Sequence, residues 1–518
     1  MLYTKHIKTL VTSGALALAC SSCSNSFLEK EPTQYVSPKQ LSRASQWNPN
    51  ILLGQTAGST QLVFDSFTTS ESNHDDFGQK ANDIHQDILS GDMEVENTEY
   101  RGFENTALML AHLSTNTNYT YRPWRLYYKI IFSANSTISL LGSDDYVKLP
   151  QSTTAQQKYY WGISKALRAY AYYNLAQFYC KPYDEAANEP ALPIYKEISA
   201  TSASRSTLKE VYAQIFKDLT DAREALVSSK IARTAKSDIN VDVIDSYLAY
   251  AYLQTGNYQE AYTAAKRVID SGRYSLISAK NLLTDGFNNV SNPEFIWAVD
   301  ITKDNTQQLA TFFAHIDVYT YGYAYVGDQK VINGDLQKEI PQTDLRGEWF
   351  SKGDSILTDE GTYEKLHDGL PIRKFFSASN TKKEYGADRL WLNDIHLMRL
   401  SELYLIAMEA AARKGNNDAE AKSLLKALMK ERVEANNLAQ VNAEIDALSG
   451  TQLLDRIYYN WRVELWGEGR SLITMKRFKK TTKRTDRSIH HAGESISYND
   501  ERLTFQIPQR ETANNPRL

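Results

Sequence analysis

Residues 243–276 read VIDSYLAYAYLQTGNYQEAYTAAKRVIDSGRYSL, and this stretch decides the fold. Its first half places four side chains on one face of a helix: Leu248, Ala249, Tyr252 and Leu253. Gly256 suits the left-handed position after a helix, and Asn257 with Glu260 predicts a capping box that starts a second helix. The second helix has its apolar face at Ala261, Ala264, Ala265, Val268 and Ile269. Small residues let two antiparallel helices approach closely, so the stretch is typical of a tetratricopeptide unit of about 34 residues.

A second unit of this kind is predicted at residues 395–432, where Lys414-Gly415 ends one helix and Asn417-x-x-Glu420 starts the next. Further helices are predicted at residues 124–141, 158–180, 207–226 and 452–468. Three long stretches show little sustained helical period: 45–120, 278–394 and 479–504. Loops this long in a compact fold usually form functional surface. The predicted fold class is therefore mainly α, with tetratricopeptide-like helix pairs and long irregular insertions.

The composition is that of an ordinary folded protein and excludes several classes. Of the 518 residues, 42% are hydrophobic and 23% are charged, which excludes a disordered polymer and a polytopic membrane protein. The 58 basic and 62 acidic residues give a net charge of −4, so no global field favours nucleic acid. The 3 cysteines, at positions 20, 23 and 180, exclude a disulfide framework. The 33 tyrosines outnumber the 17 phenylalanines and provide rings with polar tips for wet surfaces.

The first residues are typical of an export signal. Lys5 and Lys8 precede the mostly apolar run LVTSGALALA at 10–19, which is too short to span a bilayer. Cys20 and Cys23 both follow small residues, as lipoprotein signal peptidase requires, so we expect one of them to become an acylated N-terminus. The alternative is ordinary cleavage with incidental cysteines. No other stretch reaches 18 apolar residues, so we expect the protein to lie on a membrane rather than in it.

An acidic cluster is the densest candidate for chemistry. It contains Asp75, Asp76, Asp83 and Asp87, with His74 and His85 interleaved. Paired carboxylates could hydrolyse a substrate, and carboxylate oxygens could bind calcium. However, adjacent side chains do not face each other on a helix, and the histidine spacing lacks a metal-ligand pattern. The chain also has no nucleophile elbow, P-loop or dinucleotide fingerprint. We therefore expect no catalytic residue, no metal and no cofactor.

A run of basic residues could suggest nucleic acid, but its composition favours another interpretation. It comprises Lys476, Arg477, Lys479, Lys480, Lys483, Arg484 and Arg487. The run lacks interleaved aromatic residues for base stacking, and the chain is expected to be exported. We therefore predict a solvated loop or a partner contact.

The aromatic residues give the best candidates for a binding site. Residues 315–325 read HIDVYTYGYAY, and an extended backbone would point Tyr319, Tyr321, Tyr323 and Tyr325 to one side. Such a row could stack on sugars or peptide side chains, or it could pack onto the helical core. A second group, at residues 94–123, contains Tyr100, Phe103, Tyr119 and Tyr121. The predicted ligand-binding residues are Tyr319, Tyr321, Tyr323, Tyr325, Tyr100 and Tyr121. Trp297 and Trp349, which have apolar neighbours, are predicted to be core.

Several different short motifs follow one another along nearly the whole chain. They are Cys23-x-x-x-Phe27-Leu28-Glu29-x-Glu31-Pro32, the segment HDDFGQKANDIHQDILSGDM at 74–93, Trp124 with Tyr128, Ile131 and Asn135, Lys165-Ala-Leu-Arg-Ala-Tyr170, Ser206-Thr-Leu-x-Glu-Val-Tyr212, Arg399-Leu-Ser-Glu-Leu-Tyr-Leu405, Arg462-Val-Glu-Leu-x-x-Glu468-Gly-Arg470 with Lys476-Arg-Phe478, and Ile507-Pro-Gln-x-Glu511. This ordered set resembles the SusD/RagB family of Bacteroidota outer-membrane lipoproteins. The residues around Leu472–Thr474 and Gln506 depart from the family pattern.

The resemblance implies a fold, a location and a function. It implies a signal peptide at 1–22 and one SusD-like domain at 23–518, with parts at about 23–230 and 231–518 on a superhelical scaffold. It favours Cys23 over Cys20 as the lipidated residue. It also implies a non-enzymatic, surface-exposed lipoprotein of the outer membrane. Such a protein binds nutrient oligosaccharides, or peptides, and delivers them to a SusC-like TonB-dependent transporter. The rival hypotheses are a surface glycoside hydrolase and a tetratricopeptide adaptor that binds protein alone.

We predict that Cys23→Ala releases the protein from membranes and that Cys20→Ala does not, because small residues precede Cys23 and Phe27-Leu28 follows it at the family's spacing. Membrane fractionation of cells that produce each variant tests this. A Cys23→Ala protein that remains in the membrane fraction contradicts the assignment.

Overall fold

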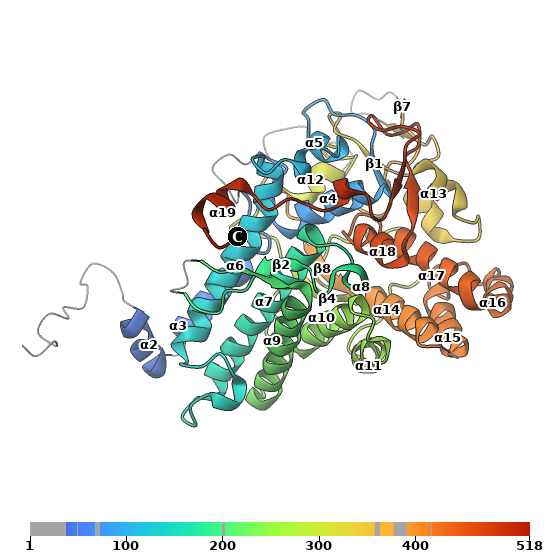
Figure 1. Ribbon diagram of the computed structural model, residues 1–518. Coiled ribbons are helices and arrows are strands. Elements are labelled where there is room, and N and C mark those ends of the chain that lie inside the picture. The colour runs from blue at the N-terminus through green and yellow to red at the C-terminus, as the bar shows by residue number, and fades with distance from the viewer. Residues whose placement is uncertain are drawn as a thin grey trace, which may run out of the picture. The chain divides into compact units, whose positions relative to one another are not determined.

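The computed structural model describes residues 38–48, 50–67, 73–198, 202–357, 363–377, 391–415 and 417–518 (Figure 1). The lipidation candidates Cys20 and Cys23 lie outside these residues. The chain divides into two units, Met1–Ile51 and Leu52–Leu518. The described part of the first unit contains α2 (Pro38–Trp47). The second unit holds the helical array and the candidate site. The expected division of the chain near residue 230 stays a prediction.

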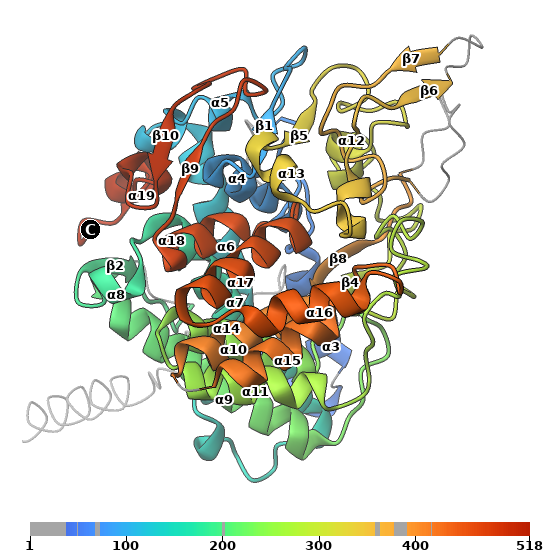
Figure 2. The same ribbon diagram turned by 90° about the vertical axis from the view of Figure 1, so that its right-hand side faces the viewer.

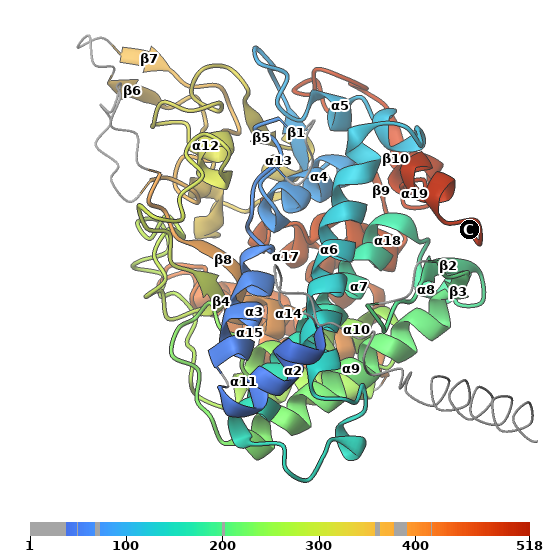
Figure 3. The same ribbon diagram turned by 90° about the vertical axis from the view of Figure 1, so that its left-hand side faces the viewer.

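An array of packed helices forms the main body of the second unit. Its members are α6 (Asn118–Leu140), α7 (Ala155–Tyr179), α9 (Leu208–Ser229), α10 (Val241–Gln254), α11 (Tyr258–Ile269), α14 (Leu400–Arg413), α15 (Asp418–Met429), α16 (Leu438–Ala447), α17 (Gly450–Glu464) and α18 (Ser471–Phe478). From α6 to α11 each long helix packs against the next in this order, and α11 then packs against α14 (Figures 1 and 3). The mainly α fold is confirmed. Within the described ranges, no helix is long and apolar enough to cross a membrane.

The tetratricopeptide-like pair forms as α10 and α11. Gly256 has a φ of 76°, the left-handed conformation that Gly adopts without strain, and it ends the first helix as predicted. Leu248, Ala249 and Leu253 are buried. The predicted capping box is wrong, because the Asn257 side chain makes no capping bond and instead donates to the Thr255 hydroxyl at 2.8 Å.

The second predicted pair forms as α14 and α15, with Gly415 at a φ of 83° between them. Here too the asparagine side chain of the expected cap, Asn417, makes no capping bond. Glu420 instead accepts a hydrogen bond from the Tyr262 hydroxyl of α11 at 2.7 Å. Glu420, which the sequence pattern predicted to cap the start of α15, therefore links the two helix pairs.

The long stretches contain helices that the sequence pattern missed, above all α3 (Asn50–Gln61) and α4 (Gln79–Ser90). Every residue of α4 is buried, including Asp83, His85 and Asp87. Its apolar residues Ala81, Ile84, Ile88 and Leu89 have helical spacing, a pattern that the sequence analysis overlooked. The shorter helices are α5 (Glu104–Ala107), α8 (Tyr183–Ala186), α12 (Phe312–Ile316), α13 (Gly334–Glu339) and α19 (Gln509–Asn514).

The strands are short and pair antiparallel in twos (Figure 2). They are β1 (Met93–Val95) with β5 (Lys330–Ile332), β2 (Pro190–Pro193) with β3 (Arg205–Thr207), β4 (Phe295–Val299) with β8 (Ile395–Arg399), β6 (Ser355–Leu357) with β7 (Tyr363–Lys365), and β9 (Thr481–Lys483) with β10 (Ser495–Ser497). The β2–β3 pair lies between α8 and α9, whereas every other pair includes at least one strand of the long insertions.

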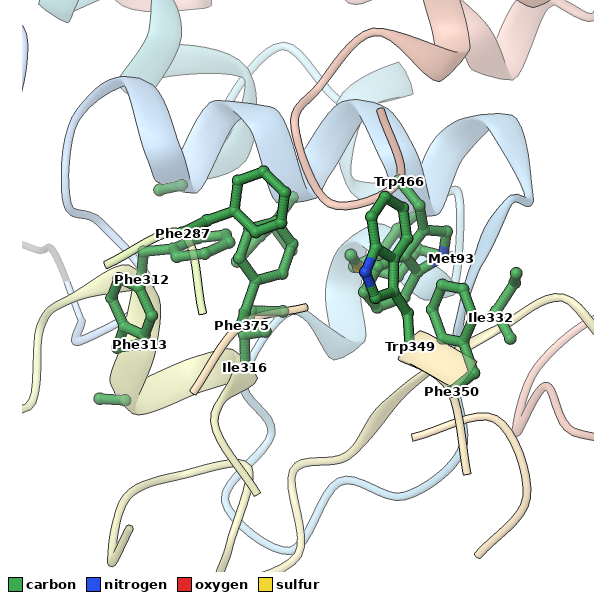
Figure 4. Close-up of a cluster of buried hydrophobic side chains, with 14 of the residues drawn as sticks. Met93, Phe287, Phe312, Phe313, Ile316, Ile332, Trp349, Phe350, Phe375 and Trp466 are labelled. Carbon is green, nitrogen blue, oxygen red and sulfur yellow. The ribbon is translucent and has the colours of Figure 1, made fainter. Parts of the chain in front are cut away.

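A large aromatic core lies between α4 and the insertions (Figure 4). Phe287, Phe312, Phe375, Trp349 and Trp466 belong to it, and all are buried. Trp297 and Trp349 have no exposed surface, so the prediction that they are core is confirmed. The insertions are therefore a second packed layer on the helices, held by burial of large rings.

Buried charges connect this layer to the array. Arg399, at the start of α14, pairs with Glu294 at 2.9 Å, Glu464 at 2.7 Å and Glu468 at 2.7 Å. Arg432 and Arg346 also pair with Glu464, at 2.7 and 3.0 Å. All these side chains are buried, so the charges are balanced inside the protein.

We predict that Gly162→Ala destabilises the protein, because a Cβ at Gly162 of α7 would clash with Leu226 of α9 and lie 3.1 Å from the Ala222 carbonyl oxygen. Overpacking of this kind costs about 1–3 kcal/mol. Gly54→Ala in α3 is the matched control, because nothing lies within 4 Å of its Cβ position. It should stabilise by about 0.5–1 kcal/mol. Urea denaturation measures both, and equal effects would contradict the close packing of α7 on α9.

Candidate functional site

One short sheet brings the two predicted aromatic groups together. β1 pairs with β5 so that Met93 faces Ile332 and Val95 faces Lys330. Because the pairing is antiparallel, the loop after β1 and the loop before β5 leave the same end of the sheet. Residues 96–103 therefore lie beside residues 319–329, although more than 200 positions separate them in the sequence.

Asp328 fastens these two loops to each other. Its carboxylate accepts the backbone N–H of Tyr100 at 2.7 Å and that of Gly102 at 2.8 Å, and the residue has no exposed surface. A Cβ at Gly102 would lie 2.5 Å from this carboxylate, so glycine is required there. The flanking Arg101 and Phe103 have φ values of 62° and 65°, which non-glycine residues adopt at a cost. Strain held by a buried carboxylate is typical of a functional loop.

The tyrosine run folds back on itself, so the expectation of an extended backbone is wrong. After α12 the chain turns, and Ala324 donates its N–H to the Ala314 carbonyl at 3.1 Å. The turn brings Gly322 against Ala314 and Trp391, where a Cβ would lie within 3 Å of both. The four tyrosines therefore do not share one side.

Tyr323 is the member of the run that joins the second aromatic group. Its ring lies 5.9 Å from the Tyr100 ring and 5.7 Å from the His74 ring, both edge to face. The His74 ring lies 5.8 Å from the Phe67 ring. We call the row Phe67, His74, Tyr323 and Tyr100 the aromatic arc. Tyr100 is 61% exposed and Phe67 is 47% exposed, so the arc presents rings to solvent.

The arc rests on a buried stack. The Tyr323 ring lies 4.6 Å from the His315 ring, and the His315 ring lies 5.2 Å from Phe77 on its other side. Burial lowers the pKa of His315 well below its usual value, so its imidazole is neutral and donates from Nε2 to the His74 carbonyl at 2.9 Å. His74 Nδ1 and the Tyr323 hydroxyl are 2.6 Å apart. The ring positions are thus fixed before any ligand arrives.

The other predicted binding residues lie elsewhere. Tyr319 packs against a small core cluster that includes Val318 and Leu370. Tyr321 and Tyr325 form a separate pair with ring centres 6.1 Å apart. Tyr121, on α6, stacks with Arg510 at 4.8 Å. Sequence reasoning missed Phe67 and did not connect His74 to the tyrosines, because their neighbours in the arc come from distant segments.

The acidic cluster is engaged in internal contacts. Asp75 pairs with Arg122 at 2.8 Å and accepts the Tyr119 hydroxyl at 3.2 Å. Asp76 lies 4.0 Å from Arg122, and Asp83 pairs with Lys80 at 3.0 Å. Asp87 accepts the N–H groups of Gly467, Gly469 and Ser471. These carboxylates hold the structure together. In the described part of the chain, no group of three or more acidic, His or Cys residues could hold a metal ion.

Part of the basic run makes buried contacts within the protein. Arg477 pairs with Glu409 at 2.7 Å, and Lys479 pairs with Asp184 at 2.8 Å. Arg484 is buried and donates to the Leu89 carbonyl at 2.9 Å. The predicted solvated loop is therefore wrong for Arg477 and Arg484, whose side chains are buried, whereas Lys479 is exposed and its ion pair lies on the surface. Lys483 is exposed, as predicted.

Two family models match the chain. Residues 55–253 match a model described as "Starch-binding associating with outer membrane", and residues 315–518 match a model described as "SusD family". The chain belongs to the SusD family. No curated protein matches the sequence.

Solved structures of SusD proteins share this fold. A SusD-like carbohydrate binding protein from Bacteroides vulgatus is 24% identical, with a TM-score of 0.74 over 90% of this chain and 97% of that one. A SusD superfamily protein from Bacteroides thetaiotaomicron is 22% identical, with a TM-score of 0.69 over 90% and 98%. Surface glycan-binding protein A from Bacteroides thetaiotaomicron, solved with laminarihexaose, is 15% identical, with a TM-score of 0.64 over 90% and 97%.

We predict that His85, beneath the arc, makes this SusD-family protein less stable in acid. Its ring contacts Thr106 and Phe103, and burial lowers its pKa to about 3. The unfolded chain takes up this proton near pH 6.5, so stability is complete above that pH and falls as the pH drops toward the folded pKa. The loss is about 1.4 kcal/mol per pH unit, or about 2 kcal/mol at pH 5.

His85→Asn removes the titrating group. The variant should be less stable at pH 7.5, and the difference from the unmodified protein should shrink by about 2 kcal/mol at pH 5. Urea denaturation at both pH values measures this. A constant difference would show that His85 titrates alike in the folded and unfolded states.

Proposed function

We propose that this protein captures a nutrient oligosaccharide on the aromatic arc and delivers it to a SusC-like TonB-dependent transporter. The observation that carries the proposal is the aromatic arc, in which Phe67, His74 and Tyr100 are exposed around the half-buried Tyr323. Asp328 and His315 fix its position. Aromatic faces bind the apolar faces of sugar rings, and a preorganised row loses little freedom when it binds. A peptide with apolar side chains is the alternative ligand.

Family membership supports the proposed setting. One matching family model is described as starch-binding and outer-membrane associated, and the structural neighbours include a protein solved with an oligosaccharide. The lipid on Cys23 would hold the protein at the surface of the outer membrane, where a transporter could receive the ligand. The long helical array offers a partner a large surface.

We propose that the protein binds without catalysis. A glycoside hydrolase needs two carboxylates about 5–9 Å apart that are free to face the scissile bond. Beside the arc, Asp75 is bound by Arg122 and Tyr119, and Asp328 is bound by two backbone N–H groups. Neither carboxylate is placed to donate or accept a proton from a ligand on the exposed rings. A protein-binding adaptor would not need the exposed arc, which disfavours that alternative.

We predict that Tyr100→Ala combined with Tyr323→Ala weakens oligosaccharide binding by roughly tenfold or more, because each stacked ring contributes on the order of 1 kcal/mol. Isothermal titration with neutral oligosaccharides, including laminarihexaose, measures the change. Because Tyr323 also supports the stack, Tyr100→Ala alone is the cleaner variant, and it should keep the melting temperature within a few degrees.

Two controls separate binding from folding. Tyr121→Ala should leave affinity unchanged, since its ring contacts Arg510 and not the arc. Tyr319→Ala should lower the melting temperature and spare affinity, because its ring packs on the small core. Unchanged affinity in the Tyr100 and Tyr323 variants would rule out the arc. Release of shortened products that stops on Asp75→Asn would mean that the protein is an enzyme.

A further inference from the structure

An open groove lies away from the aromatic arc, next to the loop between α9 and α10. Its volume is about 680 Å³, and its wall includes Tyr159, Ile231 and Ala232. The same three residues line a neighbouring depression that runs along α3. Ile231 is 37% exposed, and Pro293 is also exposed, so part of the wall is apolar. The groove and the arc are built from different elements, and Figures 1 and 3 draw α9 below α12.

Two cations in this groove have no acidic partner. Arg233 donates to the Ile296 carbonyl at 2.7 Å and to the Tyr274 hydroxyl at 3.0 Å, and Lys236 donates to the Asn292 carbonyl at 2.6 Å. No carboxylate of the described residues forms an ion pair with either side chain. Burial, and then the charge of Arg233, lower the pKa of Lys236. The two positive charges are therefore close enough to oppose each other.

The nearest carboxylate in the wall is already occupied. Asp242 accepts hydrogen bonds from Arg273 at 2.8 Å, from the Tyr274 hydroxyl at 2.9 Å and from Asn240 at 3.0 Å. Its negative charge is balanced by Arg273. The wall as a whole therefore carries a positive excess at Arg233 and Lys236.

The loop that carries both cations is held rigidly. Asp238 accepts the N–H groups of Thr234 and Ala235, each at 3.2 Å. Trp297 donates from its indole to the Ser237 carbonyl at 2.9 Å, and Ala298 donates to the Lys236 carbonyl at 3.1 Å. Surface lysines that serve solubility need no such support. A fixed guanidinium beside a fixed ammonium is the arrangement that binds an oxyanion.

We propose that Arg233 and Lys236 form an oxyanion subsite that receives the carboxylate or sulfate of an acidic sugar. The sugar ring lies against the apolar wall, near Ile231 and Pro293. The oxyanion takes the donor positions that Arg233 and Lys236 do not use internally. The choice of a sugar rests on the proposed function, whereas the oxyanion subsite rests on the groove alone.

Saturation-transfer NMR with glucuronate, glucose 6-sulfate and glucose tests the subsite in the full folded protein. At low ionic strength, at least one acidic sugar should bind roughly tenfold or more tightly than glucose, and added salt should weaken it. The sugar that binds more tightly identifies the carboxylate or the sulfate as the preferred group. Equal binding of all three sugars would overturn the proposal.

Variants locate the effect. Arg233→Gln combined with Lys236→Gln should weaken binding of the acidic sugar by roughly tenfold or more. Arg233→Lys combined with Lys236→Arg keeps both charges and should retain most of the affinity. Lys338→Gln with Lys352→Gln is the charge-matched control, because both residues are exposed on other elements. Equal loss in this control would mean a general charge effect, and no loss in the glutamine pair would also overturn the proposal.

Two further results distinguish this proposal from binding at the aromatic arc and from binding of a protein partner. Tyr100→Ala should leave glucuronate binding unchanged, so failure of the arc and failure of the groove are distinguishable. A soluble peptide of alternating Glu and Leu is the competing ligand. If it binds at tenfold lower concentration than either acidic sugar, the proposal that the ligand is a sugar is overturned and the groove is assigned to a protein partner.

Discussion

The charge of Arg399 is the constraint on which the rest of the structure depends. This guanidinium is fully buried, and it lies between Glu294, Glu464 and Glu468. Removing one partner from such a network leaves a buried charge uncompensated, at a cost of about 3–5 kcal/mol. The carboxylates come from three places, beside β4, at the end of α17 and in the turn after it. The network therefore specifies one arrangement of the helical array and the aromatic layer. The two motifs Arg399–Leu405 and Arg462–Arg470 meet in it, which explains the need for these residue types in the scaffold.

From this network a series of contacts leads to the aromatic arc. Glu468 lies between Gly467 and Gly469, whose N–H groups bind Asp87 of α4. Gly78 directly precedes α4, and a Cβ there would lie 2.5 Å from the Val63 carbonyl oxygen, so the backbone at this point packs closely on Val63. The chain just before Gly78 includes Asp75, which is fixed by Arg122, and His74, which is a member of the arc. Asp75 of the acidic cluster thus helps to position the arc.

The arc and the groove use the same physical means. In each, a side chain that can still stack or donate hydrogen bonds lies at the surface, and buried hydrogen bonds hold its backbone. Asp328 binds the N–H of Tyr100, and Trp297 and Ala298 donate to the loop that carries Lys236. Preorganisation of this kind lowers the entropy lost on binding. The exposed rings lie in the long insertions, and the two cations lie in the loop between α9 and α10.

The sequence by itself determined the helix pairs, the core tryptophans and the family, because amphipathic period, left-handed glycines and ordered motifs are local signals. It also indicated that tyrosines near 100 and 323 could bind a ligand. It could not determine which rings meet, because the β1–β5 register and the Asp328 bonds join segments more than 200 residues apart. It contained the helical spacing of Ala81, Ile84, Ile88 and Leu89 in α4, but not the burial of polar residues such as Asp87, which depends on tertiary partners. Tertiary structure alone decided that Tyr319 packs against a core cluster and that Tyr323, half-buried, lies beside Tyr100. The turn at Gly322 breaks the period of two that the sequence displays, because burial of α12 and Trp391 leaves no room for a straight strand.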